Sequence, residues 1–538
     1  MPLRLLLAVL LVAAAPVSAQ TFESSNLPIV LIDTDGVEIP DEPKIPALMR
    51  VIDNGTGARN HVTDPATAYD GHIGIEVRGN SSQAFPKKQY GLETRDADGE
   101  NNNVELLGLP EENDWILYAP YSDKSLMRNV LLYDLARDAG RYASRRRFVE
   151  VVLNGDYAGL YVLLEKVKRD DNRVDINKLK PDETSGDDLT GGYIIEVDRF
   201  AGEASGWYPG FPTTTGDGYP FYTYSTPDAD DIVPEQQAYI QDWFRTFRDV
   251  MASPDRDDPD AGYRSLVDLG SFVDFVIWQE LSRNIDGYRL STYLHKDKDS
   301  NDPRVHAGPV WDFNLAFGNA WFLGGHDVTG FQVRFPYEDT TPVSFWWLQM
   351  FETDSFQAAL RDRWTELRSG LLSDAALVAR IDALAAEVDE AQTRNFERWP
   401  VLGVYVWPNE YVGETYADEV DYLTGFVLDR AAWLDANWPY VVAQEDGPAV
   451  SRLALSAPRP NPARSGATVA LTSARAERVR VDLVDVTGRR LATVFDGPVS
   501  PSASHDVVVP TADLAPGVYV LRAWSGEAAT SRRLSVLR

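Results

Sequence analysis

The spacing of apolar residues changes twice along this chain, and the order of these changes limits the folds that the chain can adopt. Up to about residue 166, apolar residues form short or alternating runs with one helical stretch between them, which predicts mostly strands. From about 234 to 438 they recur at helical intervals. A polar joint with Gly and Pro, 443–448, precedes a return to short alternating runs. The pattern predicts an α+β body followed by a small β module.

The first part of the body is expected to be rich in strands and the second part to be mostly helical. Strands are expected at 74–77, 88–94, 115–118, 148–153 and 157–166, and one helix at 124–139. The pair Asn154-Gly155, flanked by alternating apolar residues, predicts a tight hairpin turn. Helices are expected at 234–252, 271–281, 344–367, 373–394 and 414–438. Many α+β enzymes share this order of strands and helices, so the order alone defines no function.

Length and composition exclude several classes of protein. A chain of 538 residues is long enough for two or three domains. Its 82 acidic and 51 basic residues give a formal charge of −31, which argues against a nucleic-acid partner because such a partner requires a dense cationic face. The chain contains no cysteine, which excludes disulfides, thiolate catalysis and Cys-ligated metals.

The N-terminus has the pattern of a signal peptide. Arg4 is followed by an apolar stretch at 5–15, and small residues at 17–19 match the positions that a signal peptidase reads. We expect a signal peptide at 1–19, cleaved after Ala19. The apolar stretch is too short to cross a bilayer, and no later segment approaches about 18 uninterrupted apolar residues. The mature protein is therefore expected to be exported and to have no transmembrane span.

Two acidic segments indicate a possible catalytic centre. Asp286, in the segment 283–287, follows a helix-like run, and Asp312, in the segment 311–318, follows a turn signal. Because both carboxylates are expected at the ends of elements, they can line one cleft. In phosphoryl transfer, one Asp orients and deprotonates a hydroxyl while another holds Mg²⁺ against the nucleotide phosphates. The alternative is structural, with Asp286 as a turn residue and Asp312 as a capping residue.

A set of motifs in fixed order resembles the CotH family of spore-coat-type kinases over about residues 60–430. The motifs are the two acidic segments together with 76–82, 85–90, 121–129, 148–166 and 192–198. The resemblance implies an atypical, two-lobed protein-kinase-like fold, with a β-rich N-lobe and a helical C-lobe. It also implies the use of ATP with Mg²⁺ or Mn²⁺ to phosphorylate Ser or Thr of proteins outside the cytoplasm.

The resemblance assigns roles to the acidic segments. Asp286 matches the catalytic acidic position, and Asp312 matches the metal-binding Asp. The family commonly has a second Asp two residues later, where this chain has Asn314, which supplies one neutral oxygen. This difference leaves the number and affinity of bound metals open. Asn284 is a further candidate for a metal or a phosphate-bound water, or else a helix C-cap.

Cations are needed to offset the charge of a nucleotide in so acidic a protein. Lys88 is the preferred candidate for a catalytic lysine that meets the phosphates, and Lys87 is the alternative because neighbours on a strand point to opposite faces. Arg78 can contact phosphate while the backbone amides of 79–82 approach it. The predicted nucleotide-binding set is completed by Lys124, Arg128 and Glu165. The two cations of that set can instead pair with neighbouring acids, and the glutamate can instead orient a lysine or mark the link between lobes.

The last part of the chain is expected to be a separate module at 453–538, joined by a linker at 441–452 to a body at 20–440. Five to seven short strands in so few residues predict a small β-sandwich. The module resembles the C-terminal sorting domains of the type IX secretion system, through motifs at 460–462, 484–489, 514–519 and 532–538. The resemblance implies handling by the type IX secretion machinery after Sec export, and a secreted or cell-surface location. A generic immunoglobulin-like adhesion domain is the alternative.

Three functions remain open from the sequence. The leading hypothesis is an exported protein kinase. The second is a catalytically inactive kinase-like protein with a binding or structural role at the surface, which Asn314 motivates. The third is a glycosidase with Asp286 and Asp312 as paired carboxylates, which clusters of Trp and Tyr motivate.

Overall fold

The structure is a computed structural model, and it describes most of the chain. The described residues are 22–199, 205–210, 220–336, 343–438 and 453–536, the last range with short gaps at 457, 462, 474–476, 486–488, 501–503, 513, 516 and 526–527. The chain divides into two compact units, Met1–Val442 and Ala443–Arg538. The predicted signal peptide and the predicted linker lie outside the described residues.

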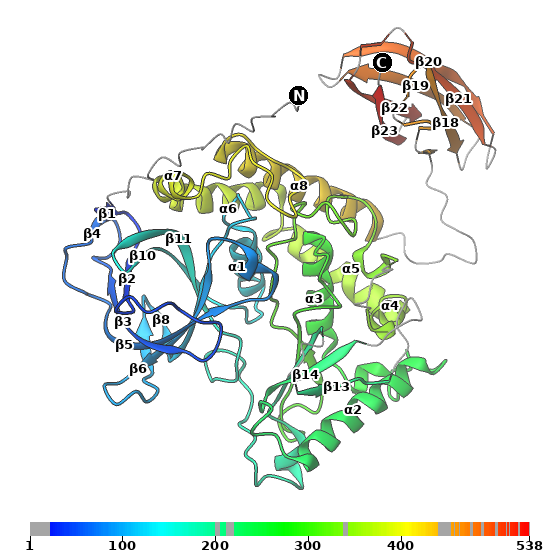
Figure 1. The fold of residues 1–538 in the computed structure, drawn as a ribbon. Helices are drawn as coiled ribbons and strands as arrows, with labels where there is room; N and C mark the ends of the chain where they lie inside the picture. Colours follow the sequence, from blue (N-terminus) through cyan, green and yellow to red (C-terminus); the bar gives the residue numbers. More distant parts are fainter. Residues whose placement is uncertain are drawn as a thin grey trace, which may run out of the picture. The chain divides into compact units, whose positions relative to one another are not determined.

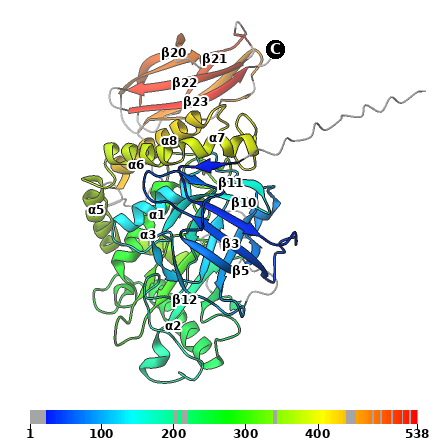
Figure 2. The same cartoon turned by 90° about the vertical axis from the view of Figure 1, so that its left-hand side faces the viewer.

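The first part of the larger unit forms a closed barrel, drawn in blue and cyan in Figures 1 and 2. The strand order is β10-β11-β9-β6-β5-β3-β2, in which a parallel pair, β10 and β2, closes the barrel. Its strands are β2 (Ile29–Asp33), β3 (Ile45–Ile52), β5 (Tyr69–Arg78), β6 (Gln89–Arg95), β9 (Asp114–Tyr118), β10 (Arg146–Leu153) and β11 (Asp156–Glu165). Buried residues such as Ile75, Leu92 and Leu163 form its core. Two short pairs accompany the barrel, β1 (Ser24–Ser25) with β4 (Asn60–His61) and β7 (Val104–Leu106) with β8 (Leu109–Glu112).

The strands expected in this part are all present within a few residues of the expected bounds. The hairpin turn between β10 and β11 is also confirmed, because Asn154 and Gly155 both have positive φ, 50° and 80°. The sequence did not predict β2 and β3, which are needed to close the sheet.

The second part of the larger unit is mostly helical but also contains a five-stranded antiparallel sheet. The sheet has the order β13-β14-β12-β15-β16. Its strands are β12 (Tyr193–Asp198), β13 (Gly206–Trp207), β14 (Phe221–Thr226), β15 (Thr292–Lys296) and β16 (Val305–Ala307). The expectation of a mostly helical half missed this sheet. Strands β15 and β16 come directly after α3 (Leu269–Ser282), so the sheet is assembled from segments on both sides of a helical region.

The helices lie close to the expected positions, but two of the expected helices are each divided in two. The remaining helices are α1 (Arg128–Asp138), α2 (Pro234–Ala252), α4 (Phe345–Phe351), α5 (Asp354–Arg368), α6 (Asp374–Glu387), α7 (Asp389–Arg398) and α8 (Tyr416–Asn437). Short 3-10 helices occur at Ser81–Ala84, Asp187–Thr190, Tyr263–Ser265 and Gln332–Arg334. The break between α4 and α5 has a local cause, because Thr353 is the N-cap of α5 and its side chain accepts a hydrogen bond from the amide of Phe356.

Helix α3 is the centre of the helical part, and residues 271–282 within it are all buried. The Asp268 side chain caps its start by accepting a hydrogen bond from the Ser271 amide at 2.8 Å. The helix ends at Arg283, which adopts the left-handed conformation with φ of 52°. This ending turns the chain sharply, so the first acidic segment leaves the helix as an ordered turn.

The smaller unit contains two sheets around one core. One sheet has the order β17-β18-β21 and the other the order β20-β19-β22-β23. Their strands are β17 (Leu453–Leu455), β18 (Gly466–Ser473), β19 (Glu477–Asp485), β20 (Arg490–Val499), β21 (His505–Pro510), β22 (Gly517–Ser525) and β23 (Ala528–Val536). Buried side chains from both sheets, including Val469, Leu483 and Leu521, form a single cluster. Within the part of the chain that the structure describes, no helix has both the length and the apolar character needed to cross a membrane.

Candidate active site

A cavity of about 310 Å³ brings the two acidic segments together with the end of a barrel hairpin. Most of its wall comes from the end of β5 with the loop that follows it, the start of β6, the end of β12, the turn after α3, and the segment after β16. Single residues of β9, α1, β11 and β14 complete the wall. Among its lining residues are Arg78, Gly79, Ser82, Asp198, Arg199, Asp286, Asp312 and Asn314. Four residues predicted from the sequence, Arg78, Asp286, Asp312 and Asn314, therefore lie around one cavity.

Asp286 is held by an arginine from the same turn. Arg289 Nη2 lies 3.0 Å from Asp286 Oδ1, and Arg289 Nε donates to the carbonyl of Ile285 at 2.9 Å. The Arg289 side chain is only 5% exposed. Because the guanidinium is fixed by packing and by a backbone carbonyl, it holds the carboxylate in one orientation.

Asp312 has a strained backbone, with φ of 62°, that helix α1 supports. The Asp312 amide donates to the Tyr133 hydroxyl at 3.1 Å, and the next amide, of Phe313, donates to Asn129 Oδ1 at 2.6 Å. The ring of Trp311 stacks on Tyr133 with centroids 5.7 Å apart. Side chains from α1 thus hold both amides of the segment that carries the Asp312 carboxylate.

Asn284 links the two acidic segments without lining the cavity. Its Nδ2 donates to the carbonyl of Asp312 at 3.2 Å, and its Oδ1 accepts a hydrogen bond from the amide of Asp286 at 3.2 Å. The side chain is buried. In this position Asn284 fixes the distance between the two segments, and both of its polar atoms have partners in the protein.

Several carboxylates share this poorly solvated region. Burial, reinforced by the negative charges of Asp286 and Asp198, raises the pKa of Asp312 to about 7, although Arg78 and Arg199 oppose the shift. Burial also raises the pKa of Asp198 above its usual value. On the same strand, burial and then Asp198 raise the pKa of Glu196 to about 8. The cavity therefore has an excess of negative potential that a cation can neutralise.

The donor atoms present fit a hard divalent cation. Asn314 Oδ1 is buried and accepts no hydrogen bond from the described residues, so a polar oxygen at the cavity has no protein partner. The described residues contain no cluster of three or more His, Asp or Glu side chains arranged to hold a metal ion. Mg²⁺ usually keeps several waters and takes only one or two carboxylates from a protein, and the oxygens of Asp312, Asp198 and Asn314 are of the kind that it prefers.

The hairpin that joins β5 to β6 covers one side of the cavity. β5 and β6 pair up to Arg78 and Gln89, so residues 79–88 form the connecting loop. Gly79 has φ of 100°, and a Cβ there would come within 2.1 Å of Ser82 Oγ, so this tight turn requires glycine. The Arg78 guanidinium lies over the ring of Trp311, 5.7 Å from its centroid. The end of β5 and this loop thus line the cavity with Arg78 and residues 79–82.

The two lysines of this hairpin do not line the cavity. Lys88 Nζ donates to the carbonyl of Gln83, within the loop itself. Lys87 is buried, with Nζ donating to Asn395 Oδ1 of α7 at 2.8 Å and to the carbonyl of Leu160 at 2.5 Å. Burial lowers the pKa of Lys87 well below its usual value. The structure thus places Lys87 between the barrel and α7 and Lys88 at the base of the loop.

Three other predicted nucleotide-binding residues have partners elsewhere. Lys124 Nζ donates to the carbonyl of Val404 at 2.6 Å and lies 3.9 Å from Glu419. Arg128 forms a buried ion pair with Asp123 at 2.6 Å, which is the alternative role that the sequence left open. Glu165 is buried and pairs with Arg145 at 2.8 Å. The structure does not bring these three residues to the cavity lining.

Residues that sequence reasoning left without a role complete the site. These are Asp198 and Arg199 at the end of β12, Asn129 at the start of α1, and Arg289. Asp198 could have been predicted as a site residue, because it is the last residue of the motif 192–198 and follows an apolar strand pattern. The sequence offered no comparable signal for Arg289.

A barrel hairpin that covers a cavity lined by carboxylates and arginines, beside a helical part, is the arrangement of a kinase-like protein of mixed α/β fold. Comparison with known families agrees, because the family described as CotH kinase protein matches residues 75–434. The chain belongs to this CotH family. A second family, described as secretion system C-terminal sorting domain, matches residues 459–537, so the chain ends in a tail that indicates export by type IX secretion to the cell surface or beyond. No curated protein matches the chain.

Proposed function

We propose that this exported protein is a kinase that transfers the γ-phosphate of ATP to Ser or Thr of proteins outside the cytoplasm. In this proposal the barrel is the N-lobe and the helical part is the C-lobe of a two-lobed fold, and the smaller unit is a β-sandwich. The observation that carries the proposal is that Asp286, Asp312 and Arg78 line one cavity under the loop 79–82. Membership of the CotH family supports it.

Asp286 is proposed to act on the substrate hydroxyl. Its carboxylate accepts the hydroxyl proton as the substrate oxygen forms a bond to the γ-phosphorus, while the bond from that phosphorus to the β-phosphate oxygen breaks and ADP leaves. Arg289 keeps the carboxylate directed by its hydrogen bond at 3.0 Å. The Arg78 guanidinium and the amides of the loop 79–82 bind phosphate oxygens.

A divalent cation, Mg²⁺ or Mn²⁺, would be held by Asp312 and Asn314, with Asp198 as a further oxygen ligand, and would neutralise charge on the phosphates. Asn284 then acts as a positioning residue, because its side chain spans the two acidic segments. The catalytic role of Lys88 remains a prediction. It would require Lys88 Nζ to leave the carbonyl of Gln83 and turn toward the nucleotide.

The route of export completes the proposal. The predicted signal peptide 1–19 would direct Sec export, and the sorting tail would then direct passage through the outer membrane. The substrate would be a protein met at the surface or outside the cell. Nucleic acid is not an expected partner, given the charge of −31.

The test is phosphate transfer by the mature chain, residues 20–538, with γ-labelled ATP and either Mg²⁺ or Mn²⁺. Labelled protein should form, and Asp286→Asn and Asp312→Asn should each reduce the rate by at least about 10²-fold. Asp327→Asn is the matched control, since this carboxylate is 54% exposed and does not line the cavity. Transfer that survives in both cavity variants would rule out the proposed site.

An inactive, nucleotide-binding protein of the surface is the second candidate. The amide of Asn314, where the family commonly has a carboxylate, favours it because a neutral ligand binds a divalent cation more weakly. Nucleotide binding without phosphate transfer would select this candidate. Asn314→Asp should then increase metal affinity, and a gain of transfer activity in that variant would identify the amide as the cause of the inactivity.

A further inference from the structure

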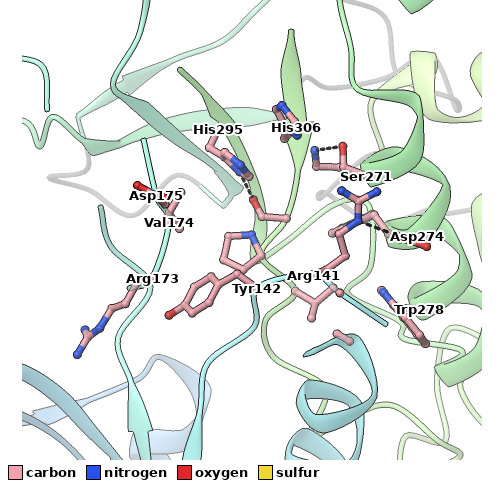
Figure 3. Close-up of a pocket in the computed structure, with 17 residues that line it drawn as sticks. Arg141, Tyr142, Arg173, Val174, Asp175, Ser271, Asp274, Trp278, His295 and His306 are labelled. Carbon is pink, nitrogen blue, oxygen red and sulfur yellow. Dashed lines mark hydrogen bonds and ion pairs between the residues drawn. The ribbon is translucent and has the colours of Figure 1, made fainter. Parts of the chain in front are cut away.

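A second cavity, of about 220 Å³, lies between the end of α1, the middle of α3 and the strands β15 and β16 (Figure 3). It shares no lining residue with the candidate active site. Its walls are largely apolar, with contributions from Ala136, Tyr142, Val174, Phe275, Pro309 and Val310. Seven lining residues are polar or charged: Arg141, Arg173, Asp175, Ser271, Asp274, His295 and His306. A cavity that combines apolar walls with converging polar groups is typical of sites for small molecules.

Two buried donors of lining residues have no hydrogen-bond acceptor among the described residues, Arg173 Nη2, which lies 3.5 Å from Glu112, and Trp278 Nε1. Trp278 of α3 is 1% exposed, and its indole Nε1 is buried without an acceptor among the described residues. Figure 3 shows the indole on the α3 side of the cavity with its nitrogen on the side that faces Arg141. A buried donor without an acceptor is unfavourable, so the site favours a ligand that supplies an oxygen.

A guanidinium with unused hydrogen-bonding capacity lies beside this donor. Arg141 Nε donates to Asp274 Oδ2 at 2.6 Å, and the other oxygen of that carboxylate accepts a hydrogen bond from Arg363 Nε at 2.8 Å. One buried carboxylate is thus shared by two guanidiniums. Arg141 Nη1 lies 3.6 Å from Asp268 Oδ1, which is beyond hydrogen-bond distance. Terminal nitrogens of Arg141 can therefore bind another carboxylate.

We propose that this cavity binds a small monocarboxylate with an apolar, ring-sized body. The apolar body fills the space beside Phe275, Pro309 and Val310, and the carboxylate accepts hydrogen bonds from Trp278 Nε1 and Arg141. The neutral His295, whose Nδ1 is 3.0 Å from the carbonyl of Gly308, forms part of the opposite wall without adding charge.

The site is connected to the candidate active site by two continuous segments. Residues 308–310 line this cavity, and the next two residues, Trp311 and Asp312, line the other. On α1, Ala136 lines this cavity, and one turn earlier the Tyr133 hydroxyl accepts a hydrogen bond from the Asp312 amide. A ligand that packs against residues 308–310 and α1 therefore changes the position of the segment that carries Asp312. This coupling makes the ligand an effector, and this part of the inference rests on the proposed function.

Ligand-observed NMR with phenylacetate and the mature chain tests the site directly. We expect a dissociation constant on the order of 1 mM for a ligand of this size. Trp278→Phe removes the donor but keeps a ring in the wall, and it should weaken binding about 10-fold. Phenylacetamide, which lacks the charge, should bind about 10-fold more weakly than the acid.

The control is Trp438→Phe. The Nε1 of Trp438 is also buried without an acceptor, but this residue does not line the cavity, so the variant should bind phenylacetate as the wild type does. Absence of binding at 10 times the expected constant, about 10 mM, would overturn the site. Equal effects of the two Trp variants would also overturn it. Equal binding of acid and amide would overturn the assignment of a carboxylate.

The coupling has a separate test, which is the affinity for a non-hydrolysable ATP analogue with Mn²⁺. Saturating phenylacetate should change that affinity by at least about 5-fold, and the analogue should change the phenylacetate affinity by the same factor. An analogue that binds with unchanged affinity would overturn the coupling. An analogue that does not bind at all would count against the proposed kinase function, whereas the NMR result would still decide whether the cavity is a ligand site.

Discussion

Arg289 orients the Asp286 carboxylate, since its side chain is 5% exposed and donates hydrogen bonds to both that carboxylate and a backbone carbonyl. Arg289→Gln keeps a polar side chain but removes the charge and the forked geometry. We expect kcat for phosphate transfer to fall on the order of 10-fold, less than the 10²-fold or more attributed to loss of a catalytic base. The KM for ATP should change by less than about 2-fold, because Arg289 is proposed to act through Asp286. Steady-state kinetics separate the two parameters, and an equal rise in KM would indicate a nucleotide-binding role instead.

His295 gives the larger unit a dependence on pH. Burial, together with the neighbouring charge of His306 and then Arg141, lowers its pKa to about 4, against the hydrogen bond to Gly308 and the charge of Asp297. Between pH 6.5 and 4 the unfolded chain therefore binds more protons at this residue than the folded chain does. Stability rises with pH in that window and is lost as the pH falls.

The pH effect of His295 can be measured by urea unfolding at pH 7 and pH 4.5. Wild type should lose about 2 kcal/mol more than His295→Gln over this interval, a value that allows for the partial exposure of the ring. His61→Gln, at the exposed residue of the short strand β4, should keep the dependence of the wild type. Identical pH profiles for wild type and His295→Gln would contradict the prediction.

At the scale of residues, site residues could be predicted from the sequence where they lie beside a turn within a recognisable motif. Asp286 and Asp312 were predicted to line one cleft, and Arg78 and Asn314 were predicted to contact the phosphates and the metal; all four line one cavity. The position of Lys88 near the hairpin could be predicted, but the direction of its long side chain could not. That direction is set by carbonyl groups brought close by folding, as for the bond from Lys88 to Gln83.

At the scale of elements, the hairpin loop between β5 and β6 lines the candidate active site through residues 79–82. Gly79→Ala places an L side chain at φ of 100°, where it is strained, and displaces Ser82 Oγ, which lies 2.1 Å from the new Cβ, so we expect the loop to shift from its position at the cavity. We expect the KM for ATP to rise about 10-fold, because the amides and Arg78 are displaced together.

Gly99→Ala is the matched control for this loop. Gly99 has φ of 88°, so alanine is strained there to a similar degree, but a Cβ at Gly99 meets no atom within 4 Å and the residue does not line the cavity. Both variants should lose on the order of 1 kcal/mol of stability, measured by thermal unfolding. Only Gly79→Ala should alter nucleotide KM, and equal kinetics in both variants would show that the loop does not contact nucleotide.

The elements themselves could be predicted where a local pattern determines them. Helix α2 has the expected bounds, and the turn at Asn154-Gly155 follows from its two residues. The sheet β13-β14-β12-β15-β16 could not be predicted in the same way, because its pairing joins strands separated by two helices, α2 and α3. Closure of the barrel by the parallel pair of β2 and β10 is likewise a tertiary effect, since parallel strands require a long connection.

At the scale of the whole molecule, the sorting tail has a core of its own, separate from the clusters of the larger unit. A unit with its own core is expected to unfold as a cooperative unit. Leu483 lies in the centre of this core and is 1% exposed. Leu483→Ala removes buried apolar volume and should destabilise the smaller unit by about 2–5 kcal/mol.

Calorimetry of the mature chain provides the measurement. The transition of the smaller unit should move down by at least about 8 °C in Leu483→Ala, because each kcal/mol shifts a domain of this size by about 4–8 °C, while the transition of the larger unit stays in place. Leu491→Ala, at a position 37% exposed on β20, should move neither transition appreciably. Phosphate transfer by Leu483→Ala should equal that of the wild type, since every proposed catalytic residue belongs to the larger unit. If both transitions shift together, the two units fold as one, and the sorting tail must then be counted as part of the kinase fold and not only as an export signal.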